Sequence, residues 1–197
     1  MVFYQFHIGK TNTLKFPPNI RIVHDRDFIK NDYSEYDDES YFRLYHSLEE
    51  IRSIVLEDIV IVTAKREDIP LIVDVINQSY TDLSVTNEQL ISYTQTEVYH
   101  SELWIMAVNK DDSSVVGCGI AEIDRELHEG VLEWIQVVPV YRGKKIGQLI
   151  VSELLKRMTS IAEFATVSGK VNNHTSPEIL YRKCGFVGND VWHILTR

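Results

Sequence analysis

The pattern of apolar and polar positions changes near residue 58. From Ile59 onward, short β-branched runs alternate with segments of helical periodicity and with polar turns. Apolar residues at every second position are typical of strands, and apolar residues at every third and fourth position are typical of helices. We therefore predict a main domain of mixed α and β structure over residues 59–197, preceded by an extension over residues 1–58.

Within the main domain the pattern predicts a defined order of elements. A strand and two helices come first, then three strands joined by polar turns, and then a helix, a buried strand, a helix and a closing strand. Proline suits a first helical turn, threonine and serine suit an N-cap, and glycine suits a helix end. The residues that predict these helix boundaries are Pro70, Thr86, Ser176 and Gly185.

The first 58 residues are rich in aromatic and acidic side chains and carry a different pattern. The acidic run at residues 31–40 predicts a loop or a solvated edge. From Ser40 to Ile51, apolar and aromatic residues recur at helical spacing, which predicts a short docked helix. Since so short a segment rarely folds alone, we expect it to pack on the main domain.

Composition narrows the class of protein. Apolar residues make up 44% and charged residues 25% of the 197 positions, and the formal net charge is −9. No apolar run reaches the roughly 20 residues of a membrane span, and an acidic chain is a poor match for nucleic acid. The two cysteines, Cys118 and Cys184, form no disulfide framework and no metal-binding spacing. We expect a cytoplasmic protein with no metal, no membrane and no nucleic-acid partner.

One short stretch carries candidate chemistry. Between an apolar run and an amphipathic one, the chain reads Arg142-Gly143-Lys144-Lys145-Ile146-Gly147. Unpaired N–H groups and the helix dipole make a helix N-terminus an anion site, and glycines let an anion approach the backbone closely. The stretch therefore predicts either a pyrophosphate site or a plain glycine turn with solvated basic residues.

The wider context resembles the GNAT superfamily of N-acetyltransferases. That family carries Arg/Gln-x-x-Gly-x-Gly/Ala after its fourth strand, and Arg142 to Gly147 occupies this motif, with Lys145 where a glycine is usual. The lead-in from Val137 to Gly143 is intact, and a second family motif is present as Leu180-Tyr181-Arg182-Lys183-Cys184-Gly185-Phe186. The resemblance covers residues 59–197 and leaves residues 1–58 unmatched.

The resemblance implies a fold and a co-substrate. The fold is a mixed, mostly antiparallel sheet with helices on both faces and a splay between two parallel strands. Acetyl-CoA would bind there, with its pantetheine arm on the strand backbone and its pyrophosphate on the turn. The residues this implies for coenzyme binding are Val137, Val138, Arg142, Gly143, Lys144, Lys145, Ile146, Gly147 and Asn173.

Amine acetylation also requires proton transfer. An alkyl amine with a pKa near 10.4 is mostly protonated at pH 7, so a base is needed. Strand alternation places Glu133 on one face with Val131, Ile135 and Val137, and we expect Glu133 to be the base, directly or through a water. Glu122 is the second candidate, and a structural ion pair with a lysine is the alternative role for Glu133.

The resemblance assigns Tyr181 as the general acid that protonates the departing thiolate, with a core tyrosine as the alternative. We expect an acetyl-CoA-dependent N-acetyltransferase that acts on a primary amine in a ternary complex. A catalytically silent module that binds coenzyme A is the competing hypothesis. The acceptor, a small molecule or a peptide, stays open, as does a homodimer. We expect the acceptor cleft at residues 78–85 and 124–130, and expect residues 1–58 to shape acceptor access or subunit contact.

Overall fold

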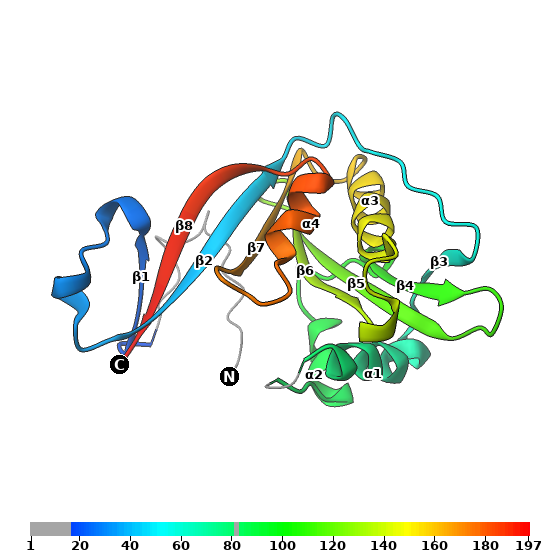
Figure 1. Ribbon diagram of the computed structural model, residues 1–197, viewed down its shortest axis with the longest axis horizontal. Helices are drawn as coiled ribbons and strands as arrows, with labels where there is room; N and C mark the ends of the chain where they lie inside the picture. The colour runs from blue at the N-terminus through cyan, green and yellow to red at the C-terminus, as the bar shows by residue number, and fades with distance from the viewer. Residues whose placement is uncertain (1–16, 81–82) are drawn as a thin grey trace.

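The computed structural model describes residues 17–80 and 83–197, which form one mixed sheet with helices on both faces (Figure 1). The strand order in the described part of the chain is β1-β8-β2-β7-β6-β5-β4-β3. The strands are β1 (Ile20–His24), β2 (Asp37–His46), β3 (Ile59–Thr63), β4 (Trp104–Asn109), β5 (Val115–Asp124), β6 (Glu129–Val137), β7 (Phe164–Lys170) and β8 (Val187–Thr196). The helices are α1 (Ile69–Ser79), α2 (Asn87–Tyr93), α3 (Ile146–Met158) and α4 (Pro177–Lys183).

Two hydrophobic clusters hold the helices to the sheet. On one face, α1 and α2 pack against Trp104, Cys118 and Trp134. On the other face, α3 and α4 cover a cluster that includes Leu132 and Phe186. The predicted fold, a mixed and mostly antiparallel sheet with helices on both faces, is confirmed.

The pairing of β6 with β7 is short and parallel. It joins Glu129–Leu132 of β6 to Phe164–Val167 of β7, and it is the parallel pair among the described strands. Both strands continue beyond this point without pairing to each other. The predicted splay therefore opens after Leu132 and Val167, with unpaired backbone on both sides of the gap.

The extension before residue 59 differs from the prediction. The expected helix from Ser40 to Ile51 is wrong, because residues 37–46 form strand β2 between β7 and β8. Phe42 and Leu44 are buried while Tyr45 is 43% exposed, which is the alternation of a strand. Pairing on both sides satisfies the backbone of β2, so tertiary contacts override the helical spacing of its apolar residues. The acidic run also runs into β2, since its last four residues begin the strand.

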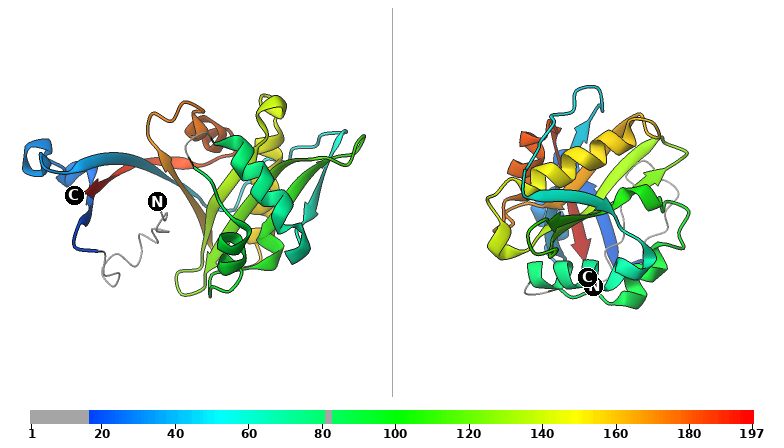
Figure 2. Two further views of the ribbon diagram at one scale, coloured as in Figure 1. Left: turned by 90° about the horizontal axis from the view of Figure 1, so that it is seen from below. Right: turned by 90° about the vertical axis from the view of Figure 1, so that its right-hand side faces the viewer.

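The three strands β1, β8 and β2 extend past the rest of the sheet as an arm (Figure 2). In the arm, residues 37–40 of β2 pair with β8 alone, and β7 joins only from Tyr41 onward. Residues 1–16 of the expected N-terminal extension lie outside the described residues, and the boundary at residue 58 stays a prediction. Within the described part of the chain, no helix has the length and apolar character to cross a membrane.

Most helix boundaries follow the local signals. Pro70 lies in the first turn of α1, and Thr86 caps α2 in a reciprocal pair with Gln89. Gly185 follows α4 with a φ of +100°, as a helix stop requires. Ser176 is the N-cap residue of α4, as expected, but it adopts a left-handed conformation and its side chain makes no capping hydrogen bond.

Candidate active site

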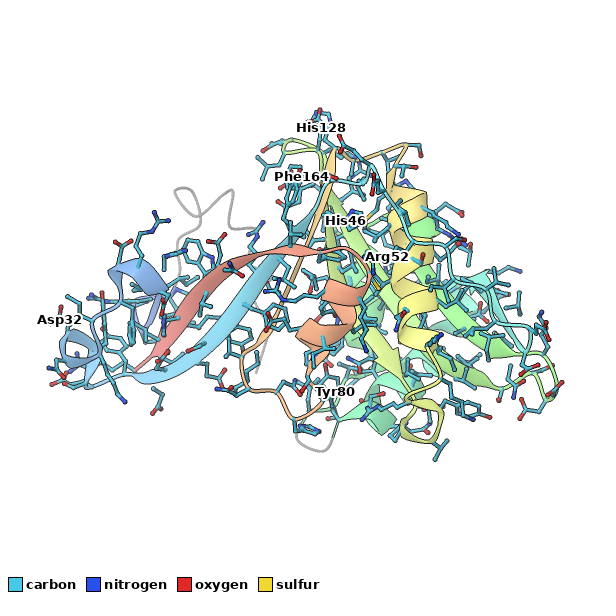
Figure 3. All side chains as sticks on the ribbon, turned by 45° about the horizontal axis from the view of Figure 1, so that its top comes forward. Asp32, His46, Arg52, Tyr80, His128 and Phe164 are labelled. Atoms are coloured by element: carbon cyan, nitrogen blue, oxygen red, sulfur yellow. The ribbon has the colours of Figure 1, made fainter. Side chains whose placement is uncertain are left out.

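A cleft of about 970 Å³ occupies the gap between β6 and β7 and extends under the arm. It is lined by the second half of β6, the turn before α3, the start of α4, and residues of β2, β7 and β8. Figure 3 places Phe164 and His128 at one end of the β6–β7 pair and Tyr80 toward the other. The cleft therefore runs along β6, with the α3 turn at the Tyr80 end.

The turn before α3 has the geometry of an anion site. Gly143 has a φ of +79°, and the space where its side chain would stand is open. Lys145, where the family usually has glycine, adopts the same left-handed region at φ 64° as the N-cap of α3. The backbone thus follows a path that glycine favours, despite the lysine. Lys144 folds back over the ring of Tyr141, with Nζ 4.9 Å from the ring centroid.

The side chain of Arg142 ties this turn to the rest of the domain. Its Nε donates to the carbonyl of Val137 at 3.1 Å, and one of its terminal nitrogens donates to the carbonyl of Ser79 at 3.1 Å. These bonds join the end of β6, the α3 turn and the C-terminus of α1. Arg142 therefore holds the shape of the turn through its side chain.

Val137 and Val138 present their backbone in different directions. The N–H of Val138 donates to the carbonyl of Val116, and its carbonyl accepts from Tyr141. In an antiparallel pair this pattern leaves the residue before it, Val137, with its N–H and carbonyl on the opposite side of the strand. Val137 therefore faces the gap, as expected for a residue that contacts pantetheine, and Val138 does not.

Glu133 lies at a β-bulge, which the sequence did not reveal. The pairing of β5 with β6 passes from Ile120↔Trp134 to Ala121↔Leu132, so Glu133 is an extra residue. The expectation that Glu133 shares a face with Ile135 and Val137 is wrong. Leu132, Ile135 and Val137 pack on the α3 side and Trp134 packs on the α1 side, so the alternation breaks at Glu133, whose charge acts on Tyr93 of α2. The bulge shifts the alternation by one residue and turns Glu133 into the cleft.

The environment of Glu133 suits a base that acts near neutral pH. Burial, followed by the negative charge of Glu122, raises the pKa of Glu133 to about 8. The Glu122 side chain is itself buried, with 2% exposure. A carboxylate with a pKa near the working pH is a better proton acceptor than one with a pKa near 4.5. Of the two candidates, Glu133 is the one that lines the cleft.

Tyr181 reaches the same cleft from α4. Its ring packs near Phe42 and Phe186, with centroids 6.3 and 5.8 Å away, and the residue is 6% exposed. Burial, with smaller effects from Tyr80, Cys184 and Glu133, raises the pKa of Tyr181 well above its usual value. The phenol therefore stays protonated at neutral pH and holds a proton that it can donate.

The remaining predicted coenzyme residues divide into two groups. Ile146, Gly147 and Asn173 line the cleft together with Val137, Arg142, Gly143 and Lys145, whereas Val138 and Lys144 are not lining residues. The side-chain oxygen of Asn173 accepts from the N–H and hydroxyl of Thr175, so it shapes the turn before α4. Within the described ranges, no group of three or more candidate side chains is arranged to hold a metal ion.

The far end of the cleft contains residues that the sequence analysis missed. Ser79, Tyr80 and Leu83 of the expected 78–85 region line the cleft, with Ser79 and Tyr80 at the end that holds the α3 turn; residues 81–82 lie outside the described residues. The expected region at 124–130 does not line it. Arg43 and Tyr41 of β2 and Trp192 of β8 stand there instead. No local motif marks Tyr41 or Arg43, because β2 reaches the cleft only through its pairing with β7 and β8.

Comparison with protein families supports the assignment. Residues 100–188 match the family model described as an acetyltransferase (GNAT) domain. This segment of the chain is similar to a GNAT domain. The match covers β4 to α4, and so includes the α3 turn, Glu133 and Tyr181 of the GNAT domain. It does not include β1, or β2, the strand that carries Arg43. No curated protein matches the chain.

Solved structures share the GNAT fold at low identity. A GCN5-related N-acetyltransferase from Sphaerobacter thermophilus has a TM-score of 0.73 at 17% identity, over 90% of this chain and 58% of that one. The ribosomal-protein-S18-alanine N-acetyltransferase of Escherichia coli has a TM-score of 0.54 at 18% identity, over 70% of this chain and 91% of that one. The NatC complex, solved with Gag peptide and CoA, has a TM-score of 0.57 at 17% identity, over 71% and 98%.

The alignment with the Sphaerobacter protein covers most of the present chain but only part of the other protein. The present chain spans little more than half of the Sphaerobacter protein. Residues 59–197 make up about seven-tenths of the present chain, so a likeness over 90% of it must include part of residues 1–58. The likeness to the Sphaerobacter GNAT structure therefore extends into the N-terminal extension.

Proposed function

We propose that this protein transfers an acetyl group from acetyl-CoA to a primary amine by direct transfer in a ternary complex. The observation that carries the proposal is one cleft that holds a turn suited to pyrophosphate, a carboxyl group with a pKa of about 8 and a protonated tyrosine. Each is a requirement of amine acetylation, and they come from three different elements.

The coenzyme end of the cleft fits acetyl-CoA. The N–H groups at the start of α3 and the open space beside Gly143 suit the diphosphate, with Lys145 adding positive charge. Pantetheine amides would pair with the backbone of Val137 along the gap, as an added strand pairs with a sheet edge. Bound in this way, acetyl-CoA would supply an activated thioester to the centre of the cleft.

The proposed reaction conserves protons and bonds. Glu133 in its ionised form takes a proton from the acceptor ammonium, directly or through a water. The neutral amine attacks the thioester carbonyl, so that a C–N bond forms and the C–S bond breaks. Tyr181 donates its proton to the departing sulfur and regains one, through water, from the nitrogen that becomes the amide, while Glu133 releases its proton to solvent. The backbone N–H of Val137 faces the gap in which the carbonyl oxygen would gain charge.

The cysteines give no support for a covalent acyl-enzyme. Both are free and buried, and burial raises the pKa of Cys118 to about 12 and that of Cys184 to about 11. A thiol acts as a nucleophile through its thiolate, which is scarce at neutral pH at such pKa values. Direct transfer to the amine is therefore the simpler route.

The proposal is tested by pH profiles of kcat/KM for the parent and for Glu133→Gln, with acetyl-CoA and a panel of amines and with thiol release as the readout. Below pH 8 both profiles should rise in parallel, because each reaction requires the loss of one proton. Above pH 8 the parent should level off, since Glu133 is then ionised. The variant should continue to rise toward the amine pKa near 10.4.

Two results would count against the proposal. Parallel profiles over the whole range would remove Glu133 as the base. Binding of acetyl-CoA with no transfer to any amine would favour a coenzyme-binding module over an enzyme. A melting shift on addition of acetyl-CoA, measured separately, reports that the coenzyme site is formed.

A further inference from the structure

Arg43 stands in the cleft but plays no part in the proposed chemistry. It lies on β2, and one of its terminal nitrogens, Nη2, donates to Oε1 of Glu129 at 2.5 Å. Glu129 is 2% exposed at its side chain and also accepts a hydrogen bond from the hydroxyl of Thr166. The carboxylate is therefore held by two donors, deep at the start of β6.

The guanidinium is not saturated by this ion pair. A guanidinium carries five N–H donors, and the second terminal nitrogen of Arg43, Nη1, is buried without a hydrogen-bond partner. The side chain nevertheless remains 15% exposed and lines the cleft that contains Glu133 and Tyr181. A charged group with unused donors is costly, and a ligand oxygen that reaches Nη1 through a rotation of the partly exposed side chain would satisfy it.

The position of Arg43 argues against a role in holding coenzyme phosphates. The α3 turn follows the end of β6 at Val137, whereas Arg43 contacts Glu129 at the start of the strand. Arg43 pairs with Ser168, one residue beyond the Leu132↔Val167 pair, so its backbone lies level with Glu133, about 13 Å before Val137 at 3.3 Å per residue, and its side chain extends away from the turn toward Glu129. Arg43 therefore belongs to the acceptor end of the cleft, with Tyr41 and Trp192.

We propose that Arg43 binds a carboxylate of the amine acceptor and so sets which amines the enzyme prefers. This inference rests on the proposed function. Glu129 and Glu133 are four residues apart on β6, or on the order of 10 Å along the strand. The amine and the carboxylate of the acceptor should be separated by a similar length, which excludes α-amino groups next to their own carboxylate.

The test uses a series of ω-amino acids, from glycine to ω-aminooctanoate, in which the distance between the amine and the carboxylate increases. Each acid is compared with its primary amide. The ratio of kcat/KM for acid over amide should be near one for the shortest members and reach about 10- to 100-fold for the longest, the value of a charged hydrogen bond. Tripeptides with Asp or Asn after the first residue then show whether a peptide carboxylate serves equally well.

Three variants separate this role from a structural one. Arg43→Met with Glu129→Gln removes the ion pair without leaving a lone buried charge, and the ratio should fall to near one. Glu129→Gln alone leaves Arg43 without its internal counter-ion, so the ratio should rise. Arg197→Met is the control, since Arg197 pairs with Glu35 outside the lining of the cleft, and it should leave the ratio unchanged. Acetyl-CoA binding checks that each variant is folded.

The outcomes are distinct. Equal use of acids and amides at every length, or a ratio that persists in the double variant, would overturn the role of Arg43 and leave the acetyltransferase proposal intact. No acetylation of any amine would instead contradict the proposed function. In that case, melting shifts with acid against amide in the presence of CoA still decide whether the cleft binds a carboxylate through Arg43.

Discussion

The two ends of the cleft are built in different ways. At the coenzyme end, the α3 turn, the end of β6 and the start of α4 lie in short stretches whose motifs can be read directly from the chain. At the proposed acceptor end, Arg43 and Tyr41 come from β2, near the start of the chain. Trp192 comes from β8, near the end of the chain, and β8 pairs with β2. The first end depends on local backbone conformation, and the second depends on which strands pair.

The two ends also differ in whether they lie inside the region that matches the family model. The matched family region includes the coenzyme end and excludes β2. A common co-substrate requires a common turn and strand backbone, whereas the acceptor differs from enzyme to enzyme. The placement of β2 between β7 and β8 thus gives the N-terminal extension a direct part in the wall of the acceptor end.

The largest expected effect tests the strand that builds the acceptor end. Leu44→Ala should destabilise the protein by about 2–5 kcal/mol, because Leu44 is 1% exposed in the cluster under α3 and α4. Tyr45→Ala should cost about 0.5–1.5 kcal/mol, since its exposed ring only stacks on Phe164. Urea unfolding measures both. Equal costs would indicate that the two side chains share one face, as in a helix.

The next effect tests the coenzyme end. Gly147→Glu should remove the stabilisation by acetyl-CoA, about 2.7 kcal/mol at 100 times Kd, because it adds a carboxylate where diphosphate would bind. Gly147→Ala is the matched control. Its added carbon would lie 3.2 Å from a flexible methyl of Leu180, so most of the coenzyme affinity should remain. A melting shift retained in the glutamate variant would place the diphosphate elsewhere.

A third prediction addresses the point where the two ends meet. Tyr181→Phe should lower kcat by roughly 10² while coenzyme affinity and stability change by no more than about 1 kcal/mol, because the phenol acts mainly in the transition state. Tyr99→Phe is the control, since Tyr99 packs against Trp104 away from the cleft lining. Full turnover in the Tyr181 variant would assign protonation of the thiolate to solvent.

The smallest effect sharpens the account of the α3 turn. Lys145→Gly should change stability by less than about 1 kcal/mol, because relief of the left-handed conformation offsets the greater freedom of the unfolded chain. Coenzyme affinity should fall only a few-fold, through loss of one positive charge. Thermal melts with and without acetyl-CoA measure both quantities. A large loss of stability without ligand would show that the lysine side chain itself supports the turn.

Several features were accessible from the sequence for a physical reason. Pro70, Thr86 and Gly185 mark helix boundaries through backbone preferences that act within a few residues. The meander from β4 to β6 follows from short apolar runs and polar turns, and the motifs around Arg142 and Tyr181 lie in the segment that matches the GNAT family model. Signals of this kind need no knowledge of distant neighbours.

Other features required the tertiary structure. Residues 40–51 have apolar side chains at helical spacing, yet β7 and β8 offer backbone partners on both sides, and strand pairing prevails. The bulge at Glu133 depends on register with β5, and it decides which face the carboxylate takes. The pKa of Glu133 near 8 depends on burial and on the charge of Glu122 on the neighbouring strand β5. The sequence by itself thus determined the likeness to a GNAT domain and the glycine-containing turn before α3, because these depend on local motifs and backbone preferences. Only the tertiary structure decided the proposed acceptor end and the raised pKa of Glu133, because these depend on long-range pairing and burial.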